Sequence, residues 1–391
     1  MRTLFITHHY LSSPGGGTFA SRAYINAFAE LSDEMTLLYP VKEGEDTFEG
    51  IHPKIQGCPV AYNASRWQKG LNILKGKVHR YGDIAHDYLA SGHFDVVVFD
   101  NSKTSFRLID EAHRYGLRVV VIHHNYEYEY VRDNSPAILR PIDLFWIERV
   151  EREAVQKADL NMVLSRQDMT LLSKAFLNGR TDSFALLGVF EYESRPSQPL
   201  HETRPAENHF IITGNLSAVQ TKQSLIPWLN TYFPILTEVV PEAHLTIAGK
   251  NPDNALTQLC KERGIELIPS PVSMAPYLQK AACYICPVDL GGGVKLRVMD
   301  GLKNGLPVIA HKVSARGYDQ FVEQGCLLPY SDPQSFRQAL EQYKHLALKR
   351  KDILHTYQRL FTFQAGVDNL RNILTAKLHN HEKSSNIGIS L

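Results

Sequence analysis

Short apolar runs alternate with amphipathic segments through most of the chain. The runs 95–99 and 118–122 are almost continuous in Val and Ile, which is typical of strands buried on both faces of a parallel sheet. The segment between them, 105–115, has the apolar spacing of a helix. This order predicts a βαβ unit, and its recurrence along the chain predicts an α/β fold with doubly wound, Rossmann-like sheets.

The length of the chain predicts two domains. Its 391 residues exceed the roughly 250–300 residues over which one hydrophobic core keeps growing. A polar, proline-bearing stretch at 189–208 separates two series of predicted strands. The expected organisation is a first Rossmann-like domain at 1–188, a linker at 189–208, a second Rossmann-like domain at 209–350, a helix at 351–378 that returns to the first domain, and a polar tail at 379–391.

Composition excludes several classes of protein. Because 42 Lys and Arg balance 41 Asp and Glu, no global charge argues for nucleic-acid binding. No run approaches the ~20 apolar residues of a membrane span, and the first residues lack the pattern of a signal peptide, so we expect a cytoplasmic protein. The five cysteines show no paired metal spacing; we interpret Cys283 and Cys286 as core thiols and expect no metal site.

A glycine loop between a strand and a helix is the strongest candidate for a ligand site. The run 282–288 predicts a buried strand, and a helical spacing follows the loop as far as Asn304. Helix N-termini carry unpaired N–H groups and a partial positive charge, and glycines allow an anion to approach them. The residues expected to bind phosphate are Gly291, Gly292, Gly293 and Val294. The alternative is a tight turn that binds nothing.

Charged residues on the entering turn of this helix strengthen the prediction. Lys295 offers a compact cation to a diphosphate, and Arg297 offers a planar fork. Asp300, one turn further on, suits ribose hydroxyls better than phosphate. The alternative for both cations is a solvated position on the helix surface.

The first domain also has a glycine loop between a strand and a helix, after its first predicted strand at 3–7. A second glycine loop leads into an amphipathic helix expected at 18–31, and we expect it to contact substrate, although such a turn is common in any doubly wound fold. Its glycines are Gly15, Gly16 and Gly17. Polar residues also follow the strand at 118–122, where ligands bind in open α/β sheets. They are His123, His124, Asn125 and Glu127, and the alternative is that the histidines are packed or surface residues.

The segment 62–81 carries five basic residues, no acid and several apolar side chains. A basic amphipathic helix is typical of contact with an anionic membrane surface, worth ~1 kcal/mol for each basic residue near the lipid. The alternatives are a solvated basic face and a groove for an anionic acceptor.

Residues 291–310, GGGVKLRVMDGLKNGLPVIA, resemble the donor-site signature of retaining family 4 glycosyltransferases (glycosyl transferases group 1) of the GT-B fold. In that signature a Glu, seven residues and a second Glu precede a helix that ends in Gly-x-Pro-Val. Asp300 takes the place of the second Glu, which binds ribose in the family. Gly292 takes the place of the first Glu, which touches the sugar, so the resemblance leaves the sugar open.

Three further positions carry the resemblance. His124 takes the His of the family's His-Asn-x-Glu motif, which touches the transferred sugar. The strand at 209–213 is followed by Gly214 and Asn215, then Lys222, where the family has Gly-Arg-Leu and a Lys on the diphosphate; here Asn215 replaces the Arg. Arg316 lies in a loop that resembles one near the donor.

The resemblance implies a GT-B fold with its two domains facing a central cleft, and a retaining glycosyltransferase. The enzyme would move a sugar from a nucleoside diphosphate sugar to a saccharide or lipid-linked acceptor, in bacterial surface polysaccharide biosynthesis. Its expected catalytic residues are His124, Lys295 and Arg297, with no metal and no cofactor beyond the nucleotide sugar. It would be cytoplasmic and peripheral on the inner face of the membrane. The alternatives are a nucleotide-sugar 2-epimerase on the same scaffold and a non-catalytic nucleotide-sugar-binding partner.

Overall fold

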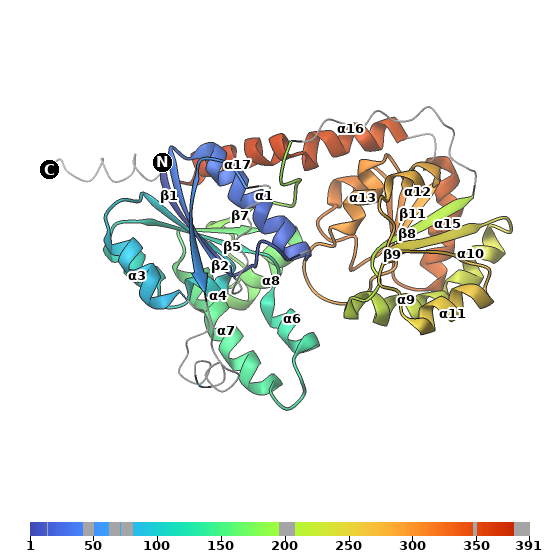
Figure 1. The fold of residues 1–391 in the computed structure, drawn as a ribbon, viewed down its shortest axis with the longest axis horizontal. Helices are drawn as coiled ribbons and strands as arrows, with labels where there is room; N and C mark the ends of the chain where they lie inside the picture. Colours follow the sequence, from blue (N-terminus) through green and yellow to red (C-terminus); the bar gives the residue numbers. More distant parts are fainter. Residues whose placement is uncertain are drawn as a thin grey trace. The chain divides into compact units, whose positions relative to one another are not determined.

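The chain forms two compact units, each built on a parallel sheet (Figure 1). The computed structural model describes residues 1–13, 15–41, 51–61, 71, 81–194, 208–346 and 350–378. Unit 1 contains Met1–Arg195 and Thr362–Leu391, and unit 2 contains Pro196–Phe361. The predicted α/β class with two Rossmann-like sheets is confirmed. Most of the linker expected at 189–208, the basic segment at 62–81 except for its two described residues, and the tail at 379–391 lie outside the described residues.

The sheet of unit 1 has the strand order β3-β2-β1-β4-β5-β6-β7, and all its pairs are parallel. Its strands are β1 (Arg2–Thr7), β2 (Glu34–Val41), β3 (Ile55–Ala61), β4 (Val96–Asp100), β5 (Arg118–His123), β6 (Leu160–Val163) and β7 (Phe184–Leu186). The order reverses between β1 and β4, where Thr7 pairs with Asp100. Ligands of open α/β sheets bind at such a switch point, beyond the carboxyl ends of the strands.

Helices pack on this sheet in the described part of unit 1. They are α1 (Gly16–Leu31), α3 (Gly82–Ala90), α4 (Ser102–Ser105), α5 (Ile109–Arg114), α6 (Glu127–Asn134), α7 (Arg140–Lys157), α8 (Arg166–Phe176) and α17 (Phe363–Leu378). The last of these, α17, lies against α1 at the other end of the sequence (Figure 1). Thr362 begins it, since its Oγ1 accepts the N–H of Ala365 (3.4 Å) as a helix cap does. The returning helix expected at 351–378 is therefore two helices, of which only α17 belongs to unit 1.

The sheet of unit 2 has the order β10-β9-β8-β11-β12-β13, again with parallel pairs. Its strands are β8 (His209–Asn215), β9 (His244–Lys250), β10 (Glu266–Pro269), β11 (Cys283–Cys286), β12 (Val308–His311) and β13 (Leu327–Tyr330). Its helices are α9 (Val219–Thr231), α10 (Phe233–Val239), α11 (Asn254–Glu262), α12 (Ala275–Lys280), α13 (Arg297–Lys303), α14 (Asp319–Glu323), α15 (Pro333–Leu346) and α16 (Arg350–Phe361). The switch point lies between β8 and β11, so the loops that follow these two strands adjoin each other.

Two predicted helix starts are wrong. Helix α1 begins at Gly16 instead of residue 18, so the glycines form its first turn. Helix α13 begins at Arg297 instead of Val294. The N–H groups of Val298 and Met299 bond the carbonyls of Lys295 and Leu296 in tight turns (3.0 and 2.9 Å). Residues 294–296 are therefore an irregular extension of the glycine loop, held by local hydrogen bonds.

Candidate functional site

The first candidate site lies in unit 2, where Arg297 crosses the backbone at the end of β8. Gly214 has a φ of +143°, a conformation that side chains rarely adopt. A Cβ atom built on Gly214 would lie 2.9 Å from Nη1 of Arg297. Only glycine therefore allows the guanidinium to lie against this stretch of backbone.

Arg297 has one arm engaged and one arm without a partner. Its Nη2 donates to Oγ1 of Thr221 in α9 (2.9 Å). Its Nη1 is buried and has no hydrogen-bond partner among the described groups. Leaving a buried donor unpaired costs about 1–3 kcal/mol, and more when the group is charged. The second arm therefore offers a preformed position for an acceptor, and a phosphate oxygen is the acceptor that suits a guanidinium fork best.

Lys295 binds the glycine loop itself. Its ammonium donates to the carbonyl oxygens of Gly291 (3.1 Å) and Gly292 (2.8 Å). The hydroxyl of Tyr318 donates to the carbonyl of Lys295 (3.1 Å) and fixes its backbone. Lys295 thus shapes the loop, and any contact of its ammonium with a diphosphate must be made from this position.

The glycine loop also meets the start of α9. A Cβ atom on Gly291 (φ +79°) would overlap the side-chain amide of Gln220. Gly293 also has a positive φ, of +70°. The loop, the first turn of α9 and Arg297 are therefore close neighbours.

Other predicted residues of unit 2 are less directly placed. Lys222 pairs with Asp253 (2.8 Å) in a partly exposed ion pair that also lowers the pKa of Asp253. Oδ1 of Asn215 accepts the N–H and hydroxyl of Ser217 (3.1 and 2.7 Å), so it closes a local turn. Asp300 is exposed in the first turn of α13, and Arg316 is half-buried after β12.

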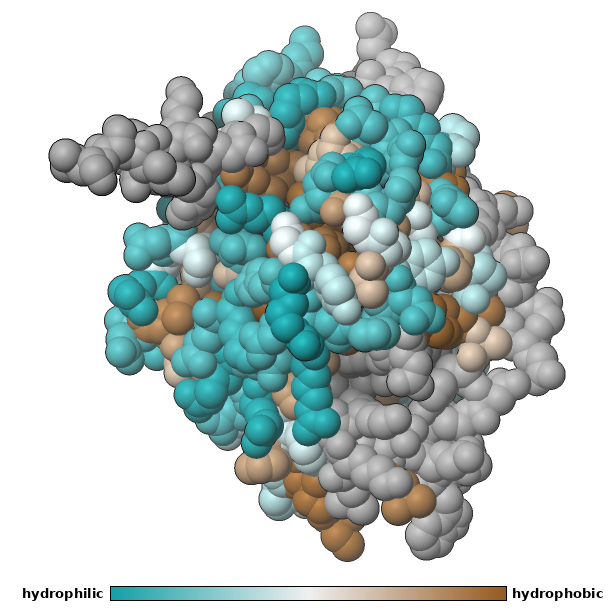
Figure 2. Space-filling view, turned by 90° about the vertical axis from the view of Figure 1, so that its left-hand side faces the viewer, coloured by the Kyte–Doolittle hydropathy of each residue, from teal (hydrophilic) through white to brown (hydrophobic). Residues whose placement is uncertain are grey.

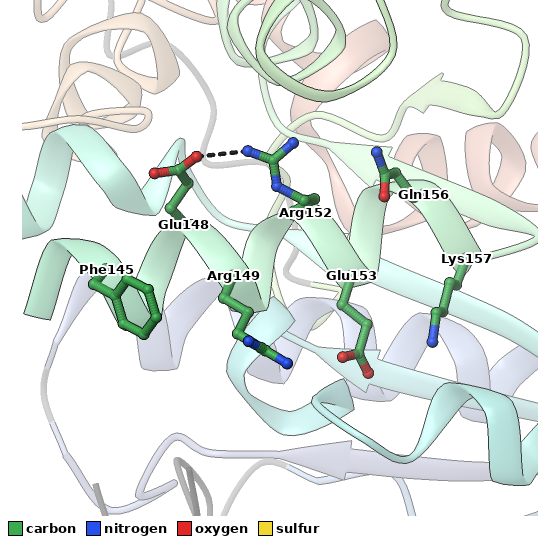
Figure 3. Close-up of a pocket in the computed structure, with 7 residues that line it drawn as sticks. All are labelled: Phe145, Glu148, Arg149, Arg152, Glu153, Gln156 and Lys157. Carbon is green, nitrogen blue, oxygen red and sulfur yellow. Dashed lines mark hydrogen bonds and ion pairs between the residues drawn. The ribbon is translucent and has the colours of Figure 1, made fainter. Parts of the chain in front are cut away.

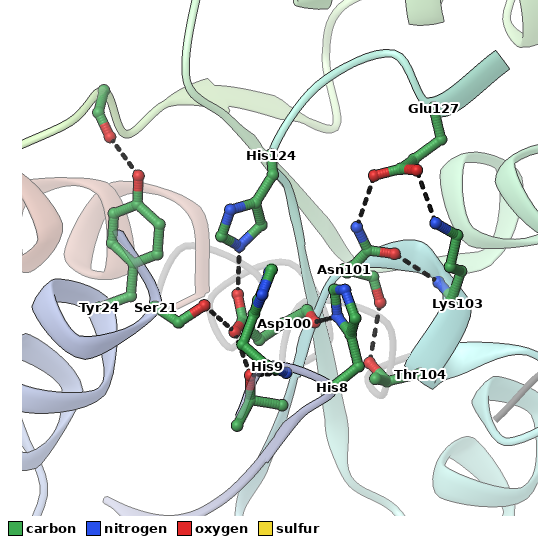
Figure 4. A network of polar contacts seen from close by, with 12 residues as sticks. His8, His9, Ser21, Tyr24, Asp100, Asn101, Lys103, Thr104, His124 and Glu127 are labelled. Atoms are coloured by element: carbon green, nitrogen blue, oxygen red, sulfur yellow. Dashed lines mark hydrogen bonds and ion pairs between the residues drawn. The ribbon is translucent and has the colours of Figure 1, made fainter. Parts of the chain in front are cut away.

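The second candidate site lies in unit 1 at the switch point between β1 and β4. Asp100, fully buried, accepts a hydrogen bond from Oγ1 of Thr7 (2.5 Å). It also accepts one from Oγ of Ser21 (2.6 Å), as Figure 4 shows. Its other oxygen, Oδ1, lies 2.5 Å from Nε2 of His124. The carboxylate thus has partners from β1, α1 and the end of β5.

This pairing fixes the charges of both groups. Burial alone would raise the pKa of Asp100, but the positive charge and hydrogen bond of His124 hold it below the usual value. Burial alone would lower the pKa of His124, but the Asp100 carboxylate outweighs it, and the pKa is raised. His124 is therefore placed as a buried imidazolium beside a carboxylate.

Two histidines that the sequence prediction missed complete this cluster. His8 and His9 follow β1, and their rings lie 4.0 Å apart between centroids. The ring of His9 lies 5.1 Å from that of His124. Burial lowers the pKa of His8 to about 4 and that of His9 well below its usual value, so both are neutral at pH 7. The same rule of strand ends that selected His124 would also have selected His8, His9 and Asp100.

The glycines of unit 1 serve this cluster. Gly15 is the N-cap of α1, Gly16 begins the helix, and Gly17 lies in its first turn. A Cβ atom on Gly17 would lie 2.5 Å from Cε1 of His9, so the absence of a side chain lets that ring pack on the helix.

Glu127 belongs to a second polar group on the same edge of the sheet (Figure 4). It accepts from Nδ2 of Asn101 (2.8 Å) and Nζ of Lys103 (2.7 Å). Burial opposes its charge, but Lys103 outweighs burial and lowers the pKa of Glu127. Glu127 is the first residue of α6, and its backbone N–H donates to the carboxylate of Glu151 in α7 (2.7 Å). Glu127 is therefore held as a structural anion that fixes Lys103.

The remaining predicted residues after β5 differ in their surroundings. His123 is 1% exposed, and its Nε2 lies 2.9 Å from Oδ1 of Asn161, so it matches the alternative of a packed strand-end residue. Asn125 has a buried Oδ1 with no partner among the described groups.

A cavity of about 410 Å³ lies along α7 (Figure 3). Figure 3 shows its lining residues along α7, where Glu148 accepts from Arg152 (2.6 Å). The lining residues are Phe145, Glu148, Arg149, Arg152, Glu153, Gln156 and Lys157. None of the predicted site residues is among them, so this cavity is not the candidate site.

Comparisons with known proteins agree with this architecture. Residues 207–344, which form most of unit 2, match the model of the family described as glycosyl transferases group 1. Sucrose-phosphate synthase from Thermosynechococcus elongatus is similar over 98% of this chain and 99% of its own, at 14% identity and a TM-score of 0.67. HepE from Anabaena, in complex with UDP, is similar over 96% and 100% of the two chains, at 15% identity and a TM-score of 0.63.

Two further similar proteins have names that refer to bacterial surface polysaccharides. The lipopolysaccharide outer core galactosyltransferase WaaB is similar over 96% of this chain and 100% of its own, at 14% identity and a TM-score of 0.61. An uncharacterised 44.6 kDa protein in the cps region of Klebsiella pneumoniae is 29% identical over 116 residues. That match spans 27% of this chain and 30% of the relative.

The fold is that of the GT-B glycosyltransferases, and the predicted fold is confirmed. The match over unit 2 agrees with the predicted class: residues 207–344 resemble glycosyl transferases group 1. These findings favour the transferase over the epimerase and the non-catalytic partner.

Proposed function

We propose that the protein is a retaining glycosyltransferase that uses a nucleoside diphosphate sugar as donor. The buried Nη1 of Arg297, unpaired beside Gly214, is the observation that carries the proposal. It offers a charged donor where the backbone is bare, and the glycine loop lies beside it. A diphosphate supplies the acceptor oxygens that this arrangement lacks.

The chemistry of glycosyl transfer explains why such a group is needed. Departure of the nucleoside diphosphate places negative charge on its phosphate oxygens while the sugar becomes oxocarbenium-like. Preorganised donors aimed at that charge lower the barrier, and one donor is typically worth about 2.7–4 kcal/mol. Arg297 is held in advance by Thr221, and Lys295 holds the loop, so little reorganisation is required during the reaction. In this proposal these cations, and no metal, stabilise the leaving group.

The two remaining parts of the donor have separate candidates. Asp300, in the first turn of α13, is proposed to bind the ribose hydroxyls. The imidazolium of His124, oriented by Asp100, is proposed to bind a hydroxyl of the transferred sugar. The glycine turn at the start of α1 is proposed to contact the substrate beside His124. With no convincing covalent nucleophile in these motifs, retention implies attack from the face of the leaving group.

The donor and acceptor classes rest on the comparisons. Similar structures of HepE contain UDP and UDP-glucose, so uridine nucleotides are the first donors to test. The similarity to a lipopolysaccharide galactosyltransferase and to a protein of a cps region supports a saccharide or lipid-linked acceptor in bacterial surface polysaccharide biosynthesis.

Peripheral membrane association is also part of the proposal. Among the described residues, no helix is long and apolar enough to cross a bilayer. The face drawn in Figure 2 is mostly hydrophilic, with separate apolar patches. The turn between α6 and α7 exposes Ile138 (86%), and the second turn of α7 exposes Phe145 (59%). Residues 134–142 contain one Arg and no acid. Sedimentation with anionic vesicles tests this: Ile138→Ser should reduce binding, and Val272→Ser, at a more exposed site of unit 2, should not.

Two measurements test the proposed reaction. UDP should raise the melting temperature and uridine should not, because the diphosphate makes the principal contacts; a ligand at 100 times its Kd stabilises by about 2.7 kcal/mol. Incubation of UDP-sugars with and without oligosaccharide acceptors then separates the alternatives. A glycosylated acceptor with the donor's anomeric configuration supports the proposal. A change of sugar configuration without acceptor supports the epimerase and sinks the transferase assignment.

A further inference from the structure

Three potential metal ligands converge at the switch point of unit 1. His9, Asp100 and His124 each bring a ring nitrogen or a carboxylate oxygen to within 4.8 Å of the others. Asp100 is 0% and His124 9% exposed. The three residues lie at the carboxyl ends of β1, β4 and β5, which are neighbours in the sheet (Figure 4). The sheet therefore holds Asp100, the last residue of β4, and brings His9 and His124 beside it from the loops that follow β1 and β5.

A buried ring nitrogen of His9 without a hydrogen-bond partner is a second, independent observation that points to a bound ion. Its Nε2 is buried and has no hydrogen-bond partner among the described groups. Buried polar atoms are nearly always satisfied, and an exception requires an explanation such as a bound ion. The ring of His9 is confined by Gly17 on α1 and packs between His8 and His124. An unpaired nitrogen is thus held beside an imidazole and a carboxylate.

We propose that His9, Asp100 and His124 bind a zinc ion. Two imidazoles and one carboxylate are a common ligand set for zinc, and three protein ligands leave a fourth position open for water or substrate. Ligand set and geometry favour zinc over magnesium or calcium, which prefer oxygen ligands.

Modest rearrangement is sufficient to bind the ion. Tetrahedral zinc with bonds of about 2.0–2.1 Å places its ligand atoms about 3.3 Å apart. The Asp100–His124 pair, now 2.5 Å apart, must open, and His9 must approach. His9 lies in the loop between β1 and α1, so it is the ligand that can move. Zinc takes the place of the proton between His124 and Asp100, and that proton leaves to solvent.

The consequence for activity rests on the proposed function. If His124 binds the transferred sugar, zinc on His124 removes that contact. The site is therefore inhibitory, and zinc competes with productive use of the His124–Asp100 pair.

Binding is measured first, on the full chain stripped of metal, by calorimetric titration with Zn²⁺ and by the visible absorption of bound Co²⁺. The test variant His9→Phe keeps an aromatic ring against Gly17 and removes both nitrogens. The matched control is His8→Phe, the same change one residue earlier. Loss of a direct ligand should exceed the roughly 10–100-fold loss found when a group that only orients a ligand is removed. We expect His9→Phe to weaken the site more than 100-fold and His8→Phe to leave one tight equivalent in place.

Equal zinc affinity and stoichiometry in the wild-type protein and in His9→Phe would overturn the proposal, as would loss of binding in His8→Phe alone. If His9→Phe lowers the melting temperature, His9→Gln supplies the same comparison with a smaller side chain.

Activity is a separate arm. Zinc should inhibit sugar transfer by the wild-type protein and by His8→Phe, and a chelator should reverse the inhibition. Zinc bound at His9 without any effect on transfer would overturn the inhibitory role. A protein that binds zinc at His9 but transfers no sugar would contradict the proposed function and support the metal site.

Discussion

Replacement of Arg297 by lysine separates the charge of the guanidinium from its planar, two-armed shape. Lysine retains the positive charge but has no fork, so it cannot bond Thr221 and a phosphate oxygen in the same geometry. A hydrogen bond to a charged group is worth about 1.5–3 kcal/mol, and loss of one transition-state donor typically lowers kcat about 10²–10³-fold. We therefore expect Arg297→Lys to lower kcat/KM for sugar transfer about 100-fold, and Arg297→Ala to lower it further.

Stability should change little in the same variants. Each variant lacks the hydrogen bond between Arg297 and Thr221, which lowers its stability. Each variant also lacks a buried N–H that has no partner among the described groups in the wild type, and this raises its stability. These effects have opposite signs and similar size, about 1–3 kcal/mol each. Chemical denaturation should therefore give nearly the same free energy of unfolding for wild type and variants.

The assay is steady-state transfer from a UDP-sugar, beside denaturation curves of the same samples. Arg337→Ala is the matched control, because Arg337 lies in α15 and pairs with Glu238 of α10 on the surface of unit 2. Transfer by Arg297→Lys within threefold of wild type would refute the assigned role, and so would a loss of activity that follows the loss of folded protein.

The remaining predictions concern pH, packing and surface charge. The Asp100–His124 pair stabilises the fold most between about pH 4 and pH 6.5. This stabilisation is lost as the pH rises through the raised pKa of His124 and as the pH falls through the lowered pKa of Asp100. Asp100→Asn should remove this pH dependence from the free energy of unfolding measured by denaturation. The same variant should move the alkaline limb of the pH–rate profile to lower pH. Gly17→Ala should destabilise the protein by about 1–3 kcal/mol through overlap with His9, whereas Gly15→Ala, whose Cβ has no neighbour closer than 3.9 Å, should not; equal melting temperatures would contradict the packing. Lys222→Ala should change the Kd of UDP less than threefold because Lys222 pairs with Asp253, and a tenfold loss by calorimetry would instead support its predicted contact with the diphosphate.

Local patterns were sufficient to predict the strands that carry the candidate sites and both glycine loops, but not the strands β3, β7 and β13. Buried parallel strands are continuous apolar runs, and the glycine loops interrupt the pattern at the strand ends where an α/β sheet binds ligands. Helix starts were less certain, because tight-turn hydrogen bonds at 294–299 and the glycines of α1 have no distinct local signature.

Contacts between residues far apart in the sequence could not be predicted from the local pattern. Arg297 and Thr221 are 76 positions apart, and their hydrogen bond depends on how α9 and α13 pack on the sheet. The pairing of Lys222 with Asp253 and the turn closed by Asn215 likewise depend on neighbours that spacing does not reveal. Asp100 was within reach of the rule that selected His124, since it ends a strand beside the switch point.

The most direct test of the central claim is a crystal structure of the full chain with UDP. The account predicts a phosphate oxygen within about 2.7–2.9 Å of Nη1 of Arg297, with the diphosphate beside Gly214 and the glycine loop. A bound diphosphate that leaves this nitrogen without a phosphate contact would contradict the account.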